Sequence, residues 1–198
     1  MDITRDRAAR TIKLGQNRHI ADLLTKFNMS EAKIVGTPSS TSIRLTKEGE
    51  PLDTAAFPYS TLVGFLMYLS ICTRPDIAQA VGALARYMAK PTTVHWTAAK
   101  TVLRYLAGTA NVGITFGGGT PDLLAYCDAD YAGDIDTRRS TTAYVFILNG
   151  GAITWKPTGS PSSGASPTGN DPAGIPARFD GIVHRSAAYM ASGSSIFS

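Results

Sequence analysis

The chain has 198 residues, of which 43% are hydrophobic and 17% charged. These values are near those of globular proteins and allow one domain or two small ones. No apolar run approaches the roughly 20 residues that a membrane span needs, and the N-terminus lacks the apolar core of a secretory signal. Cys72 and Cys127 form neither a CxxC motif nor a disulfide framework. We therefore expect a reducing intracellular setting, cytoplasmic or nuclear, and no membrane partner.

The formal net charge of +4 is distributed unevenly. Residues 1–119 hold 14 Lys and Arg against 8 Asp and Glu, whereas residues 120–198 hold 5 against 7. The balances are +6 and −2. Such a distribution would suit a polyanion held beside a metal site, and it would equally suit two ordinary protein surfaces.

The first part of the chain is predicted to form a hairpin and a helix. Residues 1–14 alternate charged and apolar positions, with a turn near Ala8 and Ala9. Residues 17–28 have apolar positions at i, i+3, i+4 and i+7, which predicts an amphipathic helix with Asn17 as its N-cap. Residues 35–55 are polar and contain Pro and Ser, so they are predicted to cross the surface as a loop.

Three further helices are predicted before residue 109. Residues 59–71 are apolar on nearly all sides, which indicates a central, buried helix. A second helix begins at Pro75 and runs to about Ala89, and Pro91 excludes its continuation. A third helix, over 94–107, is capped by Thr92 or Thr93, with Gly108 at the position after its end.

Basic side chains occur along the last two of these helices. Cations on a helix exterior are usually only solvated, and the alternative is a contact with a nucleic-acid backbone. The residues in question are Arg86, Lys90, His95, Lys100 and Arg104.

After Gly108 the pattern changes to that of strands. Residues 112–116, 123–128, 142–148 and 152–155 are predicted to pair as three or four antiparallel strands, with a hairpin turn at Asn149-Gly150-Gly151. Residues 157–181 are rich in Pro, Gly and Ser without hydrophobic periodicity, which predicts a disordered or extended segment.

An acidic cluster follows the apolar strand that begins at Leu123. Asp128, Asp130, Asp134 and Asp136 fall within nine residues. Asp-rich segments after strands are usually solvated turns. Carboxylates at the end of a strand are also a simple way to present oxygen ligands to a hard divalent cation such as Mg²⁺.

Several short motifs occur together in this chain: Ile3 to Asp6, Ile12 to Leu14, Tyr59 to Gly64, Leu66 to Leu69, Thr73 to Ile77, His95-Trp96, Ala99-Lys100, Leu103 to Thr109, Asp128 to Asp134, Arg138 to Thr141 and Tyr144 to Phe146. In combination, over about residues 1–156, they resemble the Ty1/copia class of retrotransposon Pol polyproteins.

The resemblance implies an α+β fold. Residues 1–110 would be the end of a reverse transcriptase with a helical thumb or connection, and 111–156 the start of a ribonuclease H-like domain with a small antiparallel sheet. Residues 157–198 would be a low-complexity, disordered tail. In that family acidic residues hold Mg²⁺, and the partner is an RNA–DNA hybrid. Asp128 matches the first metal-binding Asp of ribonuclease H, while Asp130 and Asp134 share its motif without being assigned as direct ligands.

The departures from the family pattern predict an incomplete catalyst. The polymerase motif Tyr-x-Asp-Asp does not occur in this sequence. In the family, the second Glu of a Glu-Ala-Glu-Tyr motif supplies a second metal ligand. The most similar segment of this sequence has Ala188 at the position of that second Glu. A single matched carboxylate would hold Mg²⁺ weakly. The alternatives are a nucleic-acid-binding module that uses Arg86, Lys90, Lys100 and Arg104, and a piece that needs the rest of the polymerase.

Overall fold

A computed structural model describes residues 1–40, 43, 45–119, 122–130 and 140–160. The strands and helices follow one another in the order β1 (Asp2–Asp6), β2 (Thr11–Gly15), α1 (Asn17–Lys26), α2 (Tyr59–Cys72), the short 3₁₀ helix η1 (Pro75–Ile77), α3 (Ala78–Ala85), α4 (Thr93–Gly108), β3 (Ile114–Gly117), β4 (Leu123–Asp130), β5 (Ser140–Leu148) and β6 (Gly151–Ser160). The α+β class predicted from the sequence is confirmed.

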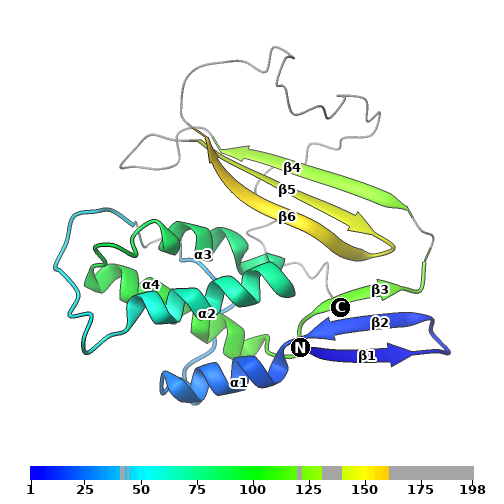
Figure 1. Ribbon diagram of the computed structural model, residues 1–198, viewed down its shortest axis with the longest axis horizontal. Helices are drawn as coiled ribbons and strands as arrows, with labels where there is room; N and C mark the ends of the chain where they lie inside the picture. Colours follow the sequence, from blue (N-terminus) through cyan, green and yellow to red (C-terminus); the bar gives the residue numbers. More distant parts are fainter. Residues whose placement is uncertain (41–42, 44, 120–121, 131–139, 161–198) are drawn as a thin grey trace, which may run out of the picture.

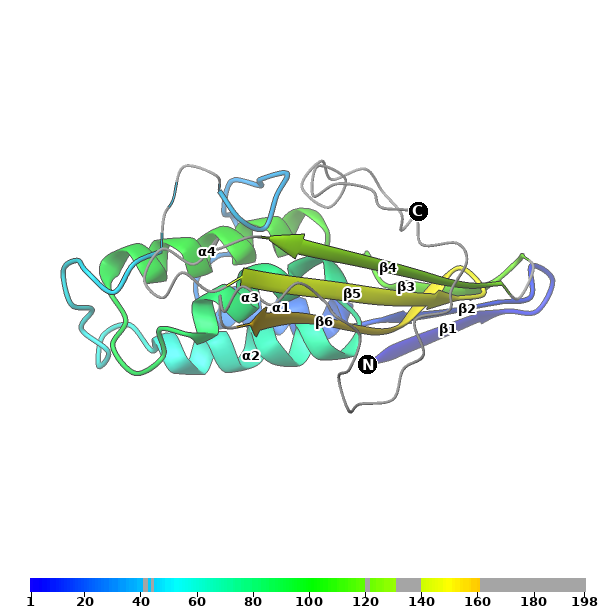
Figure 2. The same ribbon diagram turned by 90° about the horizontal axis from the view of Figure 1, so that it is seen from above.

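The strands form two antiparallel sheets, in the orders β1-β2-β3 and β4-β5-β6. Figure 1 shows the second sheet as a layer on one side of the helices, with α1 on the opposite side. Seen from above, β4, β5 and β6 overlap the helices at one end and run in roughly the same direction as α2 and α4 (Figure 2). The hairpin of β1 and β2 extends away from the helices at one end of the molecule (Figure 1).

One strand pairs differently from the prediction. The strand expected at 112–116 was assigned to the same sheet as the three strands that follow it. Instead β3 pairs with β2, with Leu14 opposite Ile114 and Ile12 opposite Phe116. The two sheets meet where β3 approaches the β5–β6 turn, since the Gly117 amide donates to the Asn149 carbonyl at 3.0 Å. At Gly151 a Cβ would lie 2.5 Å from the Phe116 ring, so only glycine fits this contact.

The hairpin turn predicted at residues 149–151 is confirmed. Asn149 and Gly150 both have positive φ, at 51° and 82°, which is what a two-residue type I′ turn requires. The returning strand is longer than expected, because it runs to Ser160, which pairs with Ser140. The prediction of a disordered segment from residue 157 is therefore wrong for 157–160, and the rest of the predicted tail, 161–198, lies outside the described residues.

The first helix ends on a local signal. Asn28 adopts a left-handed φ of 54°. Its amide donates to Thr25, and the Met29 amide donates to Leu24 at 2.8 Å. This pair of bonds is the Schellman motif, which satisfies the last free carbonyls of a helix. The predicted N-cap is wrong, because Gln16 holds the cap position and Asn17 instead bonds Asn111 through its side chain.

The buried core lies among the four α-helices. It contains Ile20, Leu23 and Leu24 of α1, Leu62, Val63, Leu66 and Leu69 of α2, Val81 and Leu84 of α3, and Ala99, Val102, Leu103 and Leu106 of α4.

Helix α2 is central, but it is buried on one face only. Leu62 and Leu66 are fully buried, whereas Met67, Tyr68 and Ile71 are 37%, 47% and 68% exposed. The prediction of burial all round is therefore wrong. A sequence that is apolar on every side carries no signal for which face the neighbouring helices cover.

Two helix ends also differ from the prediction. Helix α3 stops at Ala85, and the next residues form i→i−3 bonds, from the Tyr87 amide to Leu84 and from the Met88 amide to Ala85. Gly108 is the last residue of α4 and not the residue after it. A Cβ there would collide with the Ile34 side chain, so this glycine serves a close contact with the loop after α1.

The long polar segment between α1 and α2 is held on the helices at several points. The Leu52 amide donates to the Pro91 carbonyl at 3.0 Å, and the Thr93 amide donates to the Glu50 carbonyl at 3.1 Å. The Tyr87 hydroxyl donates to the Leu45 carbonyl at 3.0 Å. The predicted surface loop therefore packs as a strap across the α3–α4 pair. Within the described part of the chain, no helix has the length and apolar character to cross a membrane.

Candidate functional site

The acidic strand is the first candidate site. Asp128 and Asp130 lie in the last three residues of β4, where their backbones pair with Ala143 and Thr141 of β5. The side chains at 128–130 lie outside the described part of the chain, as does the whole of Asp134. Strand β4 is at an edge of its sheet, because its only neighbour among the described strands is β5.

The described residues do not assemble a metal site. No three His, Cys, Asp or Glu side chains come together among them. Mg²⁺ needs a near-octahedral set of oxygen ligands, and no such set can be built from the side chains that the structure describes. The metal-ligand role of Asp128 therefore stays a prediction.

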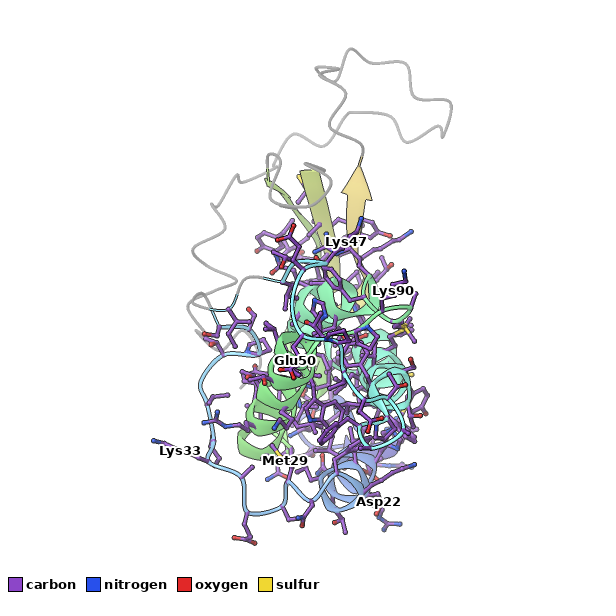
Figure 3. The ribbon with its side chains drawn as sticks, turned by 90° about the vertical axis from the view of Figure 1, so that its left-hand side faces the viewer. Asp22, Met29, Lys33, Lys47, Glu50 and Lys90 are labelled. Carbon is purple, nitrogen blue, oxygen red and sulfur yellow. The ribbon has the colours of Figure 1, made fainter. Side chains whose placement is uncertain are left out.

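The four predicted nucleic-acid contacts do not form one cluster. Arg86 and Lys90 are exposed in the turn between α3 and α4. Arg104 is further away, because a rise of 1.5 Å per residue places it about 16 Å along α4 from Thr93, the first residue of that helix. The Arg104 guanidinium donates to the Lys33 carbonyl at 2.6 Å, and that of Arg86 lies 6.0 Å from the Tyr87 ring centre. In Figure 3, Lys90 lies near one end of the helices, and Lys33 lies on their other side with its side chain pointing outward.

His95 is not part of the basic exterior, contrary to the prediction. It is fully buried and stacks on Tyr87 at a ring distance of 4.0 Å. The Thr92 amide donates to His95 Nδ1 at 2.9 Å, while the Thr92 side chain accepts from the His95 amide. This reciprocal pair is a capping box with histidine in the place usually held by Glu or Gln. Of the two predicted caps, Thr92 is confirmed, whereas Thr93 is the first residue of α4.

A cluster of polar side chains surrounds Arg74, which is completely buried. Its guanidinium donates through Nη2 to Asp76 Oδ2 at 2.6 Å and through Nε to Asp76 Oδ1 at 2.9 Å. Its Nη1 reaches the Thr109 carbonyl at 2.9 Å. The Tyr105 hydroxyl donates to the same Asp76 Oδ2 at 2.9 Å. We name Arg74, Asp76, Tyr105 and Thr109 the arginine clamp.

The arginine clamp joins the end of α2 to the end of α4. Burial and the neighbouring Asp76 carboxylate together raise the pKa of Tyr105 to about 12. The side chains satisfy one another, because every charge in the cluster has a direct partner. From the sequence, the segment Thr73 to Ile77 is interpreted as the start of a helix and as one of the motifs that carry the family resemblance. The opposite charges of Arg74 and Asp76, on either side of Pro75, were a signal for this ion pair. Its partners Tyr105 and Thr109 are about 30 residues further along the chain, and no local pattern indicated them.

The polar atoms of the arginine clamp hold neighbouring elements together. The guanidinium, the carboxylate and the phenol each face another protein group at hydrogen-bond distance, and Arg74 has no exposed surface. A similar role belongs to Thr73, whose hydroxyl donates to Gln16 Oε1 at 2.6 Å. These contacts fix α2, α4 and the start of α1 against one another.

Comparison with known proteins identifies the class of polyprotein. The chain is 46% identical over 162 residues to the retrovirus-related Pol polyprotein from transposon TNT 1-94 of Nicotiana tabacum, covering 79% of this chain and 12% of that protein. It is 44% identical over 156 residues to the Pol polyprotein from transposon RE2 of Arabidopsis thaliana, covering 78% and 11%. It is also 50% identical over 100 residues to the secreted RxLR effector protein 161 of Plasmopara viticola, covering 50% of this chain and 70% of that protein.

The chain thus belongs to the Ty1/copia-type retrotransposon Pol polyproteins, and the resemblance seen in its motifs is confirmed. It spans about an eighth of the length of the two Pol polyproteins. No family model matches it, and no solved structure does.

Proposed function

We propose that the chain is the segment of a Ty1/copia-type Pol polyprotein that runs from the end of the reverse transcriptase into the start of ribonuclease H, and that it is catalytically incomplete by itself. Residues 1–110 would be the thumb or connection, and 111–156 the partial nuclease domain. The observation that carries the proposal is the acidic motif after Leu123, in a chain of this family.

The arrangement of β4, β5 and β6 supports this proposal. The resemblance implies an antiparallel sheet with the metal-binding Asp near the end of its first strand. Asp128 stands near the end of β4, and β4, β5 and β6 follow one another as antiparallel neighbours. In the proposal Asp128 is a metal-binding residue whose partner carboxylates come from other parts of a complete nuclease.

The first experiment tests catalytic incompleteness. The chain is incubated with a labelled RNA–DNA hybrid in Mg²⁺ or Mn²⁺, and cleavage is followed on a denaturing gel. We expect no turnover above buffer. Turnover that disappears in Asp128→Asn would contradict the proposed incompleteness.

A second experiment tests the assignment of the region. Residues 1–156 are joined to the part of the tobacco TNT 1-94 polyprotein that follows its matched segment. We expect this chimera to cleave the hybrid, and Asp128→Asn to reduce its cleavage to background while Asp122→Asn does not. A folded chimera without cleavage, or one that is indifferent to Asp128→Asn, would overturn the assignment.

A second candidate function is a structural piece that packs against the rest of the polymerase. The observation that favours it is the exposed apolar face of α2, made by Met67, Tyr68 and Ile71. If this face is covered in the parent polyprotein, the isolated chain should self-associate. We expect Met67→Lys with Ile71→Lys to reduce self-association in sedimentation velocity, and an unchanged distribution would contradict this candidate.

A further inference from the structure

The capping box at the start of α4 depends on which ring nitrogen of His95 carries a proton. The imidazole is fully buried, and the Thr92 amide donates to its Nδ1 at 2.9 Å. A backbone amide can only donate, so Nδ1 is the bare acceptor and the proton of the neutral ring is on Nε2. The hydrogen bond from Thr92 to His95 therefore exists only while this histidine is neutral.

Aromatic rings lie against the His95 imidazole. Tyr87 stacks on it with ring centres 4.0 Å apart, and the Tyr59 ring centre lies at 6.3 Å. Both hydroxyls are directed to backbone carbonyls, that of Tyr87 to Leu45 and that of Tyr59 to Leu84. The two phenols thus keep their protons and supply ring surface beside the histidine.

The charged groups of the neighbouring segments are at the surface. Helix α2 contains no charged residue, and the first turn of α4 contains no acidic one. The charged side chains on the strap and on the α3–α4 turn are exposed, and they belong to Lys47, Glu48, Glu50, Arg86 and Lys90. A proton added at Nδ1 would put a positive charge on a fully buried ring, and burial disfavours the charged form.

The strap is attached to the same residues that the His95 ring holds in place. Two backbone bonds, at 3.0 and 3.1 Å, join the strap to the start of α4, and Pro51 lies opposite Thr92 in an isolated β-bridge. The Tyr87 hydroxyl, on the ring that stacks on His95, donates to the Leu45 carbonyl. The capping box and the strap contacts therefore support one another.

We propose that His95 is a pH-sensitive contact: when Nδ1 takes up a proton from water, the capping box opens and the strap over residues 45–52 detaches from the α3–α4 turn. The protonated ring has two N–H groups, so Nδ1–H would face the Thr92 amide instead of accepting from it. The ring then leaves its buried position and carries its charge into water. The proposal does not depend on Asp128 or on nuclease activity, so either can fail without the other.

The expected size follows from the titration of an exposed histidine. In the open form the ring meets water and has the ordinary histidine pKa of about 6.5, whereas the closed form holds the ring neutral. The stability of the closed form is thus fully present well above that pH and is lost as the pH falls. Between pH 7.5 and pH 5.5 the ratio of open to closed protein should rise about tenfold.

The test measures amide hydrogen exchange of the full chain by NMR at pH 7.5 and pH 5.5. Each rate is compared with the intrinsic exchange rate at the same pH to give a protection factor. The informative amides are those of Leu52, Thr92 and Thr93, because each donates within the contact region. The Leu66 amide in the core of α2 reports global unfolding.

Two variants each remove one histidine. His95→Gln keeps an acceptor oxygen for the Thr92 amide, since Gln is a usual residue at this position of a capping box, but it does not titrate. The matched control His19→Gln removes a histidine that lies against Phe65 and Tyr68.

We expect protection of the three strap and cap amides to fall about tenfold in the wild type and in His19→Gln, and to change by less than about twofold in His95→Gln. Unchanged protection in the wild type, or a fall that persists in His95→Gln, would overturn the proposal. So would an equal fall at the Leu66 amide, which would mean that acid unfolds the whole helical core.

A second measurement uses the wild type alone, so it stands even if His95→Gln does not fold. The Cε1–H resonance of His95 is followed through the same pH range. We expect its titration and the loss of strap protection to share one midpoint, and strap opening while His95 is still neutral would refute the proposal.

Discussion

The helical region and the β4–β6 sheet differ in how they use the residues that characterise this family. In the helices, the distinctive residues Arg74, Asp76 and Tyr105 are buried and bonded to one another. In the sheet, the distinctive acids stand near the end of an edge strand, and one described side-chain bond joins the sheet to the helices, from Trp155 Nε1 to the Ser70 carbonyl at 2.8 Å. The motif in the helical region thus stabilises the packing of the helices, whereas the motif in the sheet lies on the edge strand β4.

This difference teaches that a family motif is not by itself a sign of chemistry. The segment Thr73 to Ile77 carries the family resemblance, as the acidic strand does. Its Arg74 and Asp76 side chains are nevertheless bonded to each other and to Thr109 and Tyr105, so they hold the ends of α2 and α4 together. The contrast also predicts that the two regions differ in mutational sensitivity, which four measurements can test.

The largest effect is expected when the arginine clamp is broken. Arg74→Met removes the cation and leaves the largely buried Asp76 carboxylate without its ion-pair partner. We expect a loss of about 3–5 kcal/mol in the free energy of unfolding, measured by urea denaturation. Arg18→Met, which removes an exposed cation, should change it by less than about 0.5 kcal/mol. A loss below about 1 kcal/mol in Arg74→Met would show that the clamp is not a main support of the helices.

The next effect separates the two faces of α2. Leu66→Ala deletes a fully buried side chain and should cost about 2–5 kcal/mol in the free energy of unfolding. Ile71→Ala on the same helix removes an exposed side chain and should cost less than about 0.5 kcal/mol. Similar losses in the two variants would mean that the outer face of α2 is covered in solution.

A smaller effect concerns the Tyr105 hydroxyl. Tyr105→Phe removes a hydrogen bond to a carboxylate, which should cost about 1.5–3 kcal/mol at neutral pH. Since the pKa of Tyr105 is raised from 10 to about 12 in the folded protein, its stabilisation is fully present below pH 10 and is lost as the pH rises toward 12. Burial also raises the pKa of Tyr59, which acts in the same direction.

The pH profile of the variant identifies the Tyr105 contribution. The difference in urea midpoint between wild type and Tyr105→Phe should be constant up to about pH 10 and should shrink above it. A difference that stays constant through pH 12 would contradict the assigned pKa of Tyr105.

The smallest effect tests the link between the two regions. Trp155→Phe removes the hydrogen bond to Ser70 and should cost about 0.5–1.5 kcal/mol. We expect faster hydrogen exchange of the amides in β5 and β6, with exchange in α2 and α4 unchanged, because the sheet can open separately from the helical core. Faster exchange of the α4 amides as well would mean that sheet and helices unfold as one unit.

Much of the secondary structure could be predicted because its signals are local. Periodic apolar residues defined α1, a continuous apolar segment defined α2, Thr92 marked the start of α4, and Asn149-Gly150 fixed the β5–β6 turn. Each of these depends on residues within a few positions of one another. The candidate site was harder to predict, because the sequence shows its Asp residues but not which other side chains lie near them in the folded protein.

What the sequence alone determined is the family, the α+β class and the position of most helices and strands. The tertiary structure decided that β3 pairs with β2, that His95 is buried against Tyr87, that α2 exposes one apolar face and that Arg74 is held by Asp76 and Thr109. All four depend on how separate elements pack against one another, as Arg74 does with Thr109. Local propensity and periodicity say which segments are strands or helices, but strand partners and buried faces are selected by packing between elements.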